Sequence, residues 1–168
     1  MTRVIGAVMI VAAFSLSGAV KAGELRARAR RLSALVSALE LMRCEVVDRL
    51  APVPDIIERL AVSGPEASRC FFRQLSLEIA GLGEREFSEI WSSCVGTLDL
   101  RHEEAEAMRG LGRSLGRYGA AEQDGAISRC MALLESFAAQ AREEAAAGTK
   151  LYGGLGVTVG LLLAIMLI

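Results

Sequence analysis

The feature that most constrains this chain is a pair of charge-free stretches at its two ends. The first covers residues 4–20, between Arg3 and Lys21, and the second covers residues 151–168, directly after Lys150. A helix rises about 1.5 Å per residue, so each stretch reaches roughly 26 Å, near the lower limit for crossing a bilayer's hydrocarbon core. Every charged residue lies outside them. The sequence therefore predicts transmembrane helices over 4–20 and 151–168.

The segment between them, residues 21–149, has the length of one domain. The chain carries 19 basic and 20 acidic residues, a net charge of −1, so no overall field attracts nucleic acid. Aromatic residues make up only 5%, too few for platforms on which bases stack. We therefore expect no nucleic-acid partner.

The basic residues around the two stretches predict the orientation in the membrane. One arginine, Arg3, precedes the first stretch, whereas a dense cluster follows it, namely Lys21, Arg26, Arg28, Arg30 and Arg31. Basic residues concentrate on the cytoplasmic side, so residues 21–149 are predicted to be cytoplasmic, with both termini outside. A cleaved signal peptide, with small residues at 17–19 as the cleavage site, stays open as an alternative. The arginine cluster downstream disfavours it.

Helical periodicity dominates the middle of the chain. From Glu24 to Leu50, apolar residues recur at steps of three and four, namely Leu32, Val36, Leu39, Met42, Val46 and Leu50. Pro52 and Pro54 end this helix, which is predicted to continue directly from the first membrane span.

Proline and glycine residues that interrupt the helical pattern predict five further helices. Their expected bounds are 54–62, 65–80, 84–97, 99–118 and from about 120 into the second membrane span. Asp99 is the predicted N-cap of the fifth helix of the chain. Six helices in up-down order place both ends on one side of a bundle, which two anchors in one membrane require. The predicted fold is thus all-α: an antiparallel six-helix bundle flanked by an N-terminal and a C-terminal transmembrane helix.

Residues capable of catalysis or metal binding are sparse. Four cysteines lie in apolar helical patterns without a CxxC pair, and we expect buried thiols in a reducing compartment, namely Cys44, Cys70, Cys94 and Cys130. A disulfide framework stays open only if the domain lies outside the cell. The single histidine, His102, falls in a charged run where a solvated side chain is expected. Adjacent carboxylates at 103–104 and 143–144 are expected on solvated faces. We predict no enzyme activity, catalytic residue, metal, cofactor or small-molecule substrate.

Two pairs of glycines have helix-packing spacing. Gly156 and Gly160 form a GxxxG pair in the second span, where another membrane helix could approach closely. A dinucleotide-binding loop is rejected for this glycine-rich stretch, because no βαβ unit surrounds it. Gly112 and Gly116 form a similar pair inside the fifth predicted helix. Glycine costs about 1 kcal/mol in a helix interior, so a neighbouring helix is expected on that face, from the bundle or from a partner.

The arginines that follow the first span, at 26, 28, 30 and 31, form a basic stripe where the helix leaves the membrane. Contact with anionic lipid headgroups is the simplest interpretation, and a docking site for an acidic partner is the alternative.

The layout resembles the stage III sporulation protein AB family over nearly the whole length. The resemblance is carried by GAVMIVAAF at 6–14, LVSALELMRCE at 35–45, Trp91, and the closing span. Its most specific part is LGRSLG at 111–116, followed by Gln123. Gly119 departs from the family pattern, which has an aspartate there, so Glu122 or Asp124 must substitute for that acid.

The resemblance implies a fold similar to the cytoplasmic domain of the type II secretion and type IV pilus platform protein. It also implies a structural, non-enzymatic subunit of the channel complex between mother cell and forespore, in the mother-cell inner membrane. Expected partners are a cytoplasmic secretion-type ATPase and other membrane subunits, with homo-oligomer formation left open. The alternative is a platform subunit of a type II secretion or pilus-like system outside sporulation.

Overall fold

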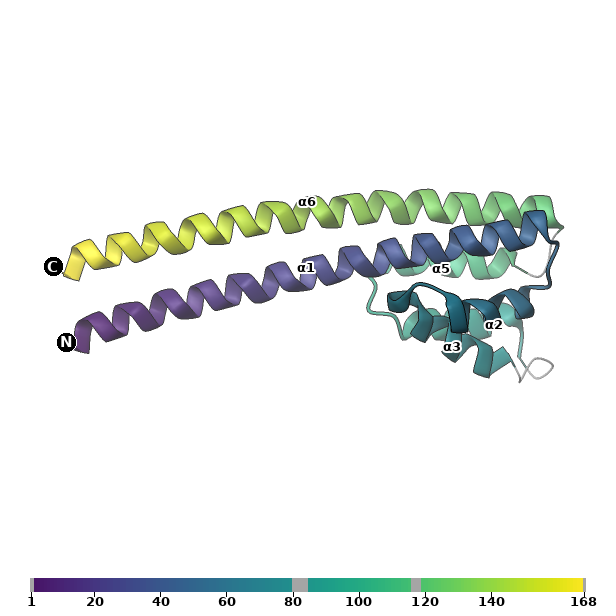
Figure 1. The fold of residues 1–168 in the computed structure, drawn as a ribbon, viewed down its shortest axis with the longest axis horizontal. Helices are drawn as coiled ribbons and strands as arrows, with labels where there is room; N and C mark the ends of the chain where they lie inside the picture. Colours follow the sequence, from purple (N-terminus) through teal and green to yellow (C-terminus); the bar gives the residue numbers. More distant parts are fainter. Residues whose placement is uncertain (1, 80–84, 116–118, 168) are drawn as a thin grey trace. The chain divides into compact units, whose positions relative to one another are not determined.

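The computed structural model describes residues 2–79, 85–115 and 119–167, with side chains described for 20–79, 85–115 and 119–148. Within these residues the regular elements are six helices (Figure 1). They are α1 (Thr2–Asp48), α2 (Val53–Ser63), α3 (Glu66–Ile79), α4 (Phe87–Gly96), α5 (His102–Ser114) and α6 (Ala120–Leu167). The predicted all-α class and the six helices are confirmed.

The predicted continuity of the first and last helices is also confirmed. α1 continues without a break from the first charge-free stretch past Gly23, and α6 continues into the second. Within the described residues, no helix combines the length and apolar character that a membrane crossing needs. The two predicted spans lie outside the residues whose side chains are described, except for Val20.

The chain forms two compact units, and the first consists of residues 1–29 and 139–168. Here α1 and α6 are joined by buried alanines and by an ion pair in which Arg28 Nη1 lies 3.2 Å from Glu144 Oε2. Alanine side chains allow two helix axes to approach closely. The buried alanines are Ala22, Ala29, Ala141 and Ala145. The beginning of α1 and the end of α6 lie at the same end of this unit, as predicted from the even helix count (Figure 1).

The second unit, residues 30–138, contains the main core. Trp91 of α4 is fully buried and meets Phe71 of α3 edge-on, with 5.3 Å between ring centroids; Phe71 in turn meets Phe72 at 4.9 Å. Such edge-to-face geometry suits the ring quadrupoles. Other fully buried large side chains come from all six helices, among them Leu32, Leu35, Leu39, Met42, Ile56, Ile57, Leu75, Ile90, Met108, Ile127 and Leu134.

The end of α1 corrects one prediction. Leu50, the last residue of the predicted apolar stripe, is 73% exposed, because α1 ends at Asp48 and Leu50 adopts a left-handed backbone with φ 50°. The N–H of Ala51 then donates to the carbonyl of Glu45 at 3.2 Å. Pro52 follows as the N-cap of α2.

The structure also differs from the prediction at both ends of α5. The N-cap is Arg101 rather than Asp99, because the Glu104 carboxylate accepts a hydrogen bond from the Arg101 backbone N–H at 2.8 Å. Asp99 instead pairs with Arg31 of α1 at 2.7 Å. The helix ends at Ser114, short of the predicted end at 118, and residues 116–118 lie outside the described residues.

Candidate interaction surfaces

The residues considered for chemistry lie apart from one another. His102 is exposed at the first position of α5, as predicted, and so is the neighbouring Glu103. Glu104, predicted on a solvated face, is instead buried, because its carboxylate caps α5. Among the described residues, no three histidine, cysteine or acidic side chains gather in a group that could hold a metal ion.

The cysteines divide into two classes, all with free thiols. Cys94 and Cys130 are buried as predicted, and burial raises the pKa of their thiols to about 11 and about 12. The prediction is wrong for Cys44 and Cys70, which are exposed. Each lies beside the buried face of its helix, and the helical turn of about 100° per residue carries it outward.

The basic stripe on α1 is largely engaged within the chain. Arg28 is 9% exposed and pairs with Glu144 inside the first unit, while Arg31 pairs with Asp99 inside the second. Arg26 and Arg30 are exposed. Arg26 also takes part in an interaction within the described residues, so the stripe is not a uniformly free basic surface.

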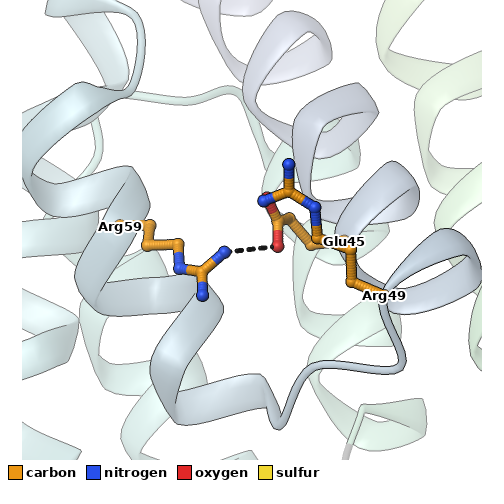
Figure 2. Close-up of polar contacts among 3 residues, drawn as sticks. All are labelled: Glu45, Arg49 and Arg59. Carbon is orange, nitrogen blue, oxygen red and sulfur yellow. Dashed lines mark hydrogen bonds and ion pairs between the residues drawn. The ribbon is translucent and has the colours of Figure 1, made fainter.

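A carboxylate links α1 to α2 in the second unit. Glu45 accepts from Arg59 of α2 at 2.8 Å and from Arg49, which directly follows the end of α1, at 2.7 Å. Figure 2 shows the Arg59 side chain crossing from α2 toward Glu45. Glu45 ends the stretch 35–45 that carries the family resemblance. Its position at the junction of α1 and α2 gives it a role in helix placement.

The glycine of the LGRSLG stretch lies against the only tryptophan of the chain. Trp91 Nε1 donates to the carbonyl of Met108 at 2.7 Å, which draws the indole across Gly112. A Cβ atom on Gly112 would lie 2.2 Å from Trp91 Cδ1. The predicted neighbouring helix on this face is therefore confirmed at Gly112: it is α4, which packs there through the side chain of Trp91. Gly116 lies outside the described residues.

The start of α6 shows how the departure at position 119 is accommodated. Gly119 accepts from the N–H of Gln123, and the carboxylate of Glu122 would lie 3.1 Å from a Cβ on Gly119. Asp124 is paired with Arg43 of α1. Glu122 is thus the acid beside the positive end of the α6 dipole, where a carboxylate is stabilising.

An open groove of about 690 Å³ runs along α5 and α6 in the second unit, beside the point where Cys130 Sγ lies 3.5 Å from the carbonyl oxygen of Ala107. Its floor is apolar, with small residues that include Ala107, Gly110 and Ala126, and with Leu133 and Phe137 toward one end. Charged residues lie along it, acidic in the first half of α5 and basic farther along. We call it the α5–α6 groove; its charged residues are Glu103, Glu106, Arg113 and Arg129.

Sequence reasoning did not identify this groove, although a signal was present. Small residues occur on α5 at steps of three and four, at Ala107, Gly110 and Ser114. They form a face distinct from the one containing Gly112. Two small faces on one helix indicate two neighbours, of which α4 accounts for the first.

The comparisons with known proteins agree over the full length. Residues 3–168 match the family described as stage III sporulation protein AB. Stage III sporulation protein AB of Bacillus subtilis (strain 168) is 25% identical over 174 residues, which cover 99% of each chain. No solved structure matches the chain significantly. The chain belongs to the stage III sporulation protein AB family.

Proposed function

We propose that this chain is a non-enzymatic, membrane-anchored platform subunit of the sporulation channel complex between mother cell and forespore. Its partners in this proposal are a cytoplasmic secretion-type ATPase and other membrane subunits. The observation that carries the proposal is the family match over residues 3–168, which includes both charge-free ends as well as the helical middle. A sporulation relative matched over 99% of both chains supports the same assignment.

The membrane anchoring rests on residues 4–20 and 151–168. Both are free of charge, and both belong to continuous helices, the backbone form that satisfies its own hydrogen bonds in lipid. The excess of arginine and lysine on the inner flanks supports a cytoplasmic bundle with both termini outside.

A structural role is supported by how the polar side chains of the second unit are used. Glu45 ties α1 to α2, Asp99 ties the loop before α5 to α1, and Glu104 caps α5. These contacts hold helices in place. The exposed surface then remains for partners.

The natural cysteines make the topology testable in the native chain. Cys44 and Cys70 are exposed and lie in the proposed cytoplasmic bundle. A membrane-impermeant maleimide added to intact cells should leave them unlabelled and should label them after permeabilisation. A Thr2→Cys variant, with its new thiol near the outer terminus, should label in intact cells. Labelling of the native chain in intact cells would contradict the proposed orientation.

The complex itself is tested by recovery. The tagged full chain, solubilised from sporulating cells in mild detergent, should retain the ATPase and the other channel subunits, identified by mass spectrometry. Deletion of its gene should block sporulation and leave vegetative secretion unchanged. Normal sporulation together with a secretion defect would instead favour a platform outside sporulation.

A further inference from the structure

The α5–α6 groove has a glycine that nothing inside the described structure requires. A Cβ on Gly110 would meet only the flexible end of Arg113, with Nη2 3.7 Å away. Glycine nevertheless costs about 1 kcal/mol relative to alanine in a helix interior. At Gly112 the indole of Trp91 explains that cost. At Gly110 the backbone faces the open groove. The cost of this glycine is therefore explained if a segment from outside the bundle approaches the backbone closely there.

The groove is also apolar where it is open to solvent. Leu133 is 49% exposed, and Phe137 is half-buried beside it. Small residues beneath a groove let a docked helix approach the backbone closely, and the larger apolar side chains at one end provide contact area. A groove between two antiparallel helices suits a third helix laid along them.

Charge gives this groove a direction. The two lining acids, Glu103 and Glu106, lie in the first half of α5, whereas Arg113 lies in its last turn. The Arg129 guanidinium folds back over Gly125, toward the same basic end. Among the described residues Glu103, Arg113 and Arg129 form no ion pair, while Glu106 pairs with Arg109. The dipole of α5 explains an acid at its first turn, Glu103, and a base at its last turn, Arg113. It does not explain Arg129, which belongs to α6.

We propose that the α5–α6 groove binds one amphipathic helix of another protein, oriented by charge. The face of that helix toward the groove carries alanine and leucine, its N-terminal turn is acidic and lies at Arg113 and Arg129, and its C-terminal turn is basic and lies at Glu103 and Glu106. This polarity also agrees with the dipole of the bound helix. The helix runs antiparallel to α5. The inference deepens the proposed platform function, on which it rests for the existence of a protein partner.

A designed peptide tests the groove directly. The probe is a fluorescein-labelled peptide of about 14 residues, roughly the length of α5. It has two glutamates in the first turn, alanine and leucine on one face, two lysines in the last turn, and a lactam staple that keeps it helical. Its counterpart exchanges the glutamates and lysines. Fluorescence anisotropy with the full chain in detergent micelles should show about tenfold tighter binding of the glutamate-first peptide.

Two variants of the chain complete the test. Reversing all four groove charges, with Glu103→Lys, Glu106→Lys, Arg113→Glu and Arg129→Glu, should reverse the preference between the peptides. Gly110→Met should fill the floor and weaken binding of the glutamate-first peptide about tenfold. The matched control is Gly96→Met, because Gly96 is exposed on α4 and a Cβ there meets no atom within 4 Å; it should bind like the native chain.

Several results would overturn the inference. They are equal affinity for the two peptides, no measurable binding, or binding that survives Gly110→Met. A dimer of the chain that sedimentation detects and that Gly110→Met dissociates would make a second copy the occupant instead. Intact recovery of the channel complex alongside failed peptide binding would refute the groove while leaving the platform function standing.

Discussion

Replacing Gly112 with alanine should destabilise the second unit through a single steric contact. The added Cβ would lie 2.2 Å from Cδ1, 2.5 Å from Cγ and 2.9 Å from Nε1 of Trp91. Carbon atoms in contact prefer 3.5–4.0 Å, so the indole must retreat by more than about 1 Å. It cannot do so easily, because Phe71 and Phe87 contact its ring and Nε1 is bonded to the Met108 carbonyl.

The expected cost follows from these contacts. Overpacking a core site costs about 1–3 kcal/mol, and breaking the buried indole hydrogen bond adds about 1–3 kcal/mol. The better helix propensity of alanine returns about 1 kcal/mol. We therefore expect a loss of about 3 kcal/mol in the free energy of unfolding. Trp91 is the only tryptophan, so its emission in a urea titration of the full chain in micelles reports this unit.

The matched control lies two residues earlier on the same helix. Gly110→Ala adds the same methyl group where the nearest atom outside the helix backbone is 3.7 Å away, so we expect stabilisation of about 0.5–1 kcal/mol. Opposite signs at the two positions are the signature of the Trp91 contact. If Gly112→Ala were as stable as Gly110→Ala, the packing argument would be refuted.

Three further substitutions or measurements test other parts of the structure. Glu45→Gln should lower the free energy of unfolding by about 1 kcal/mol, because it weakens both arginine contacts, whereas the exposed Glu58→Gln should change it little in the same urea titration. Leu50→Gly should raise the free energy of unfolding by about 0.5–1 kcal/mol, because glycine adopts positive φ without strain. Val62→Gly, equally exposed but helical, should lower it by about 1 kcal/mol. If both variants were stabilised, the backbone argument would be disproved. At pH 8 the exposed Cys44 and Cys70 should react with iodoacetamide within minutes, whereas Cys94 and Cys130 should react only on unfolding. Burial and pKa values of about 11 and about 12 keep the thiols of Cys94 and Cys130 protonated. Rapid alkylation of Cys130, detected by mass spectrometry, would contradict its burial.

Much of the fold followed from local pattern. The helical period, the prolines at 52 and 54, and the glycine–proline pair at 64–65 located all six helices, with bounds that differ from the structure by a few residues. Local signals were less reliable for caps, because several residues before α5 could serve as its N-cap. A backbone hydrogen bond to Glu104 decided for Arg101 rather than Asp99.

The candidate site was less predictable, since it depends on which helices are neighbours. The stripe of four arginines looked uniform in the sequence, yet Arg28 and Arg31 find acids 116 and 68 positions away in the chain. The α5–α6 groove likewise exists only because two helices meet. Its small residues on α5 become meaningful once α6 supplies the opposite wall.

The sequence by itself determined what depends on near neighbours: two charge-free ends, helical periodicity and the family to which the chain belongs. The tertiary structure alone decided which residues beside each predicted apolar stripe are buried. Cys44 and Cys94 have similar apolar surroundings in the sequence, yet one is exposed and the other is buried. Gly110 and Gly112 lie two positions apart, yet Trp91 covers only the second. The physical reason is that burial depends on contacts between helices, and residues far apart along the chain make those contacts.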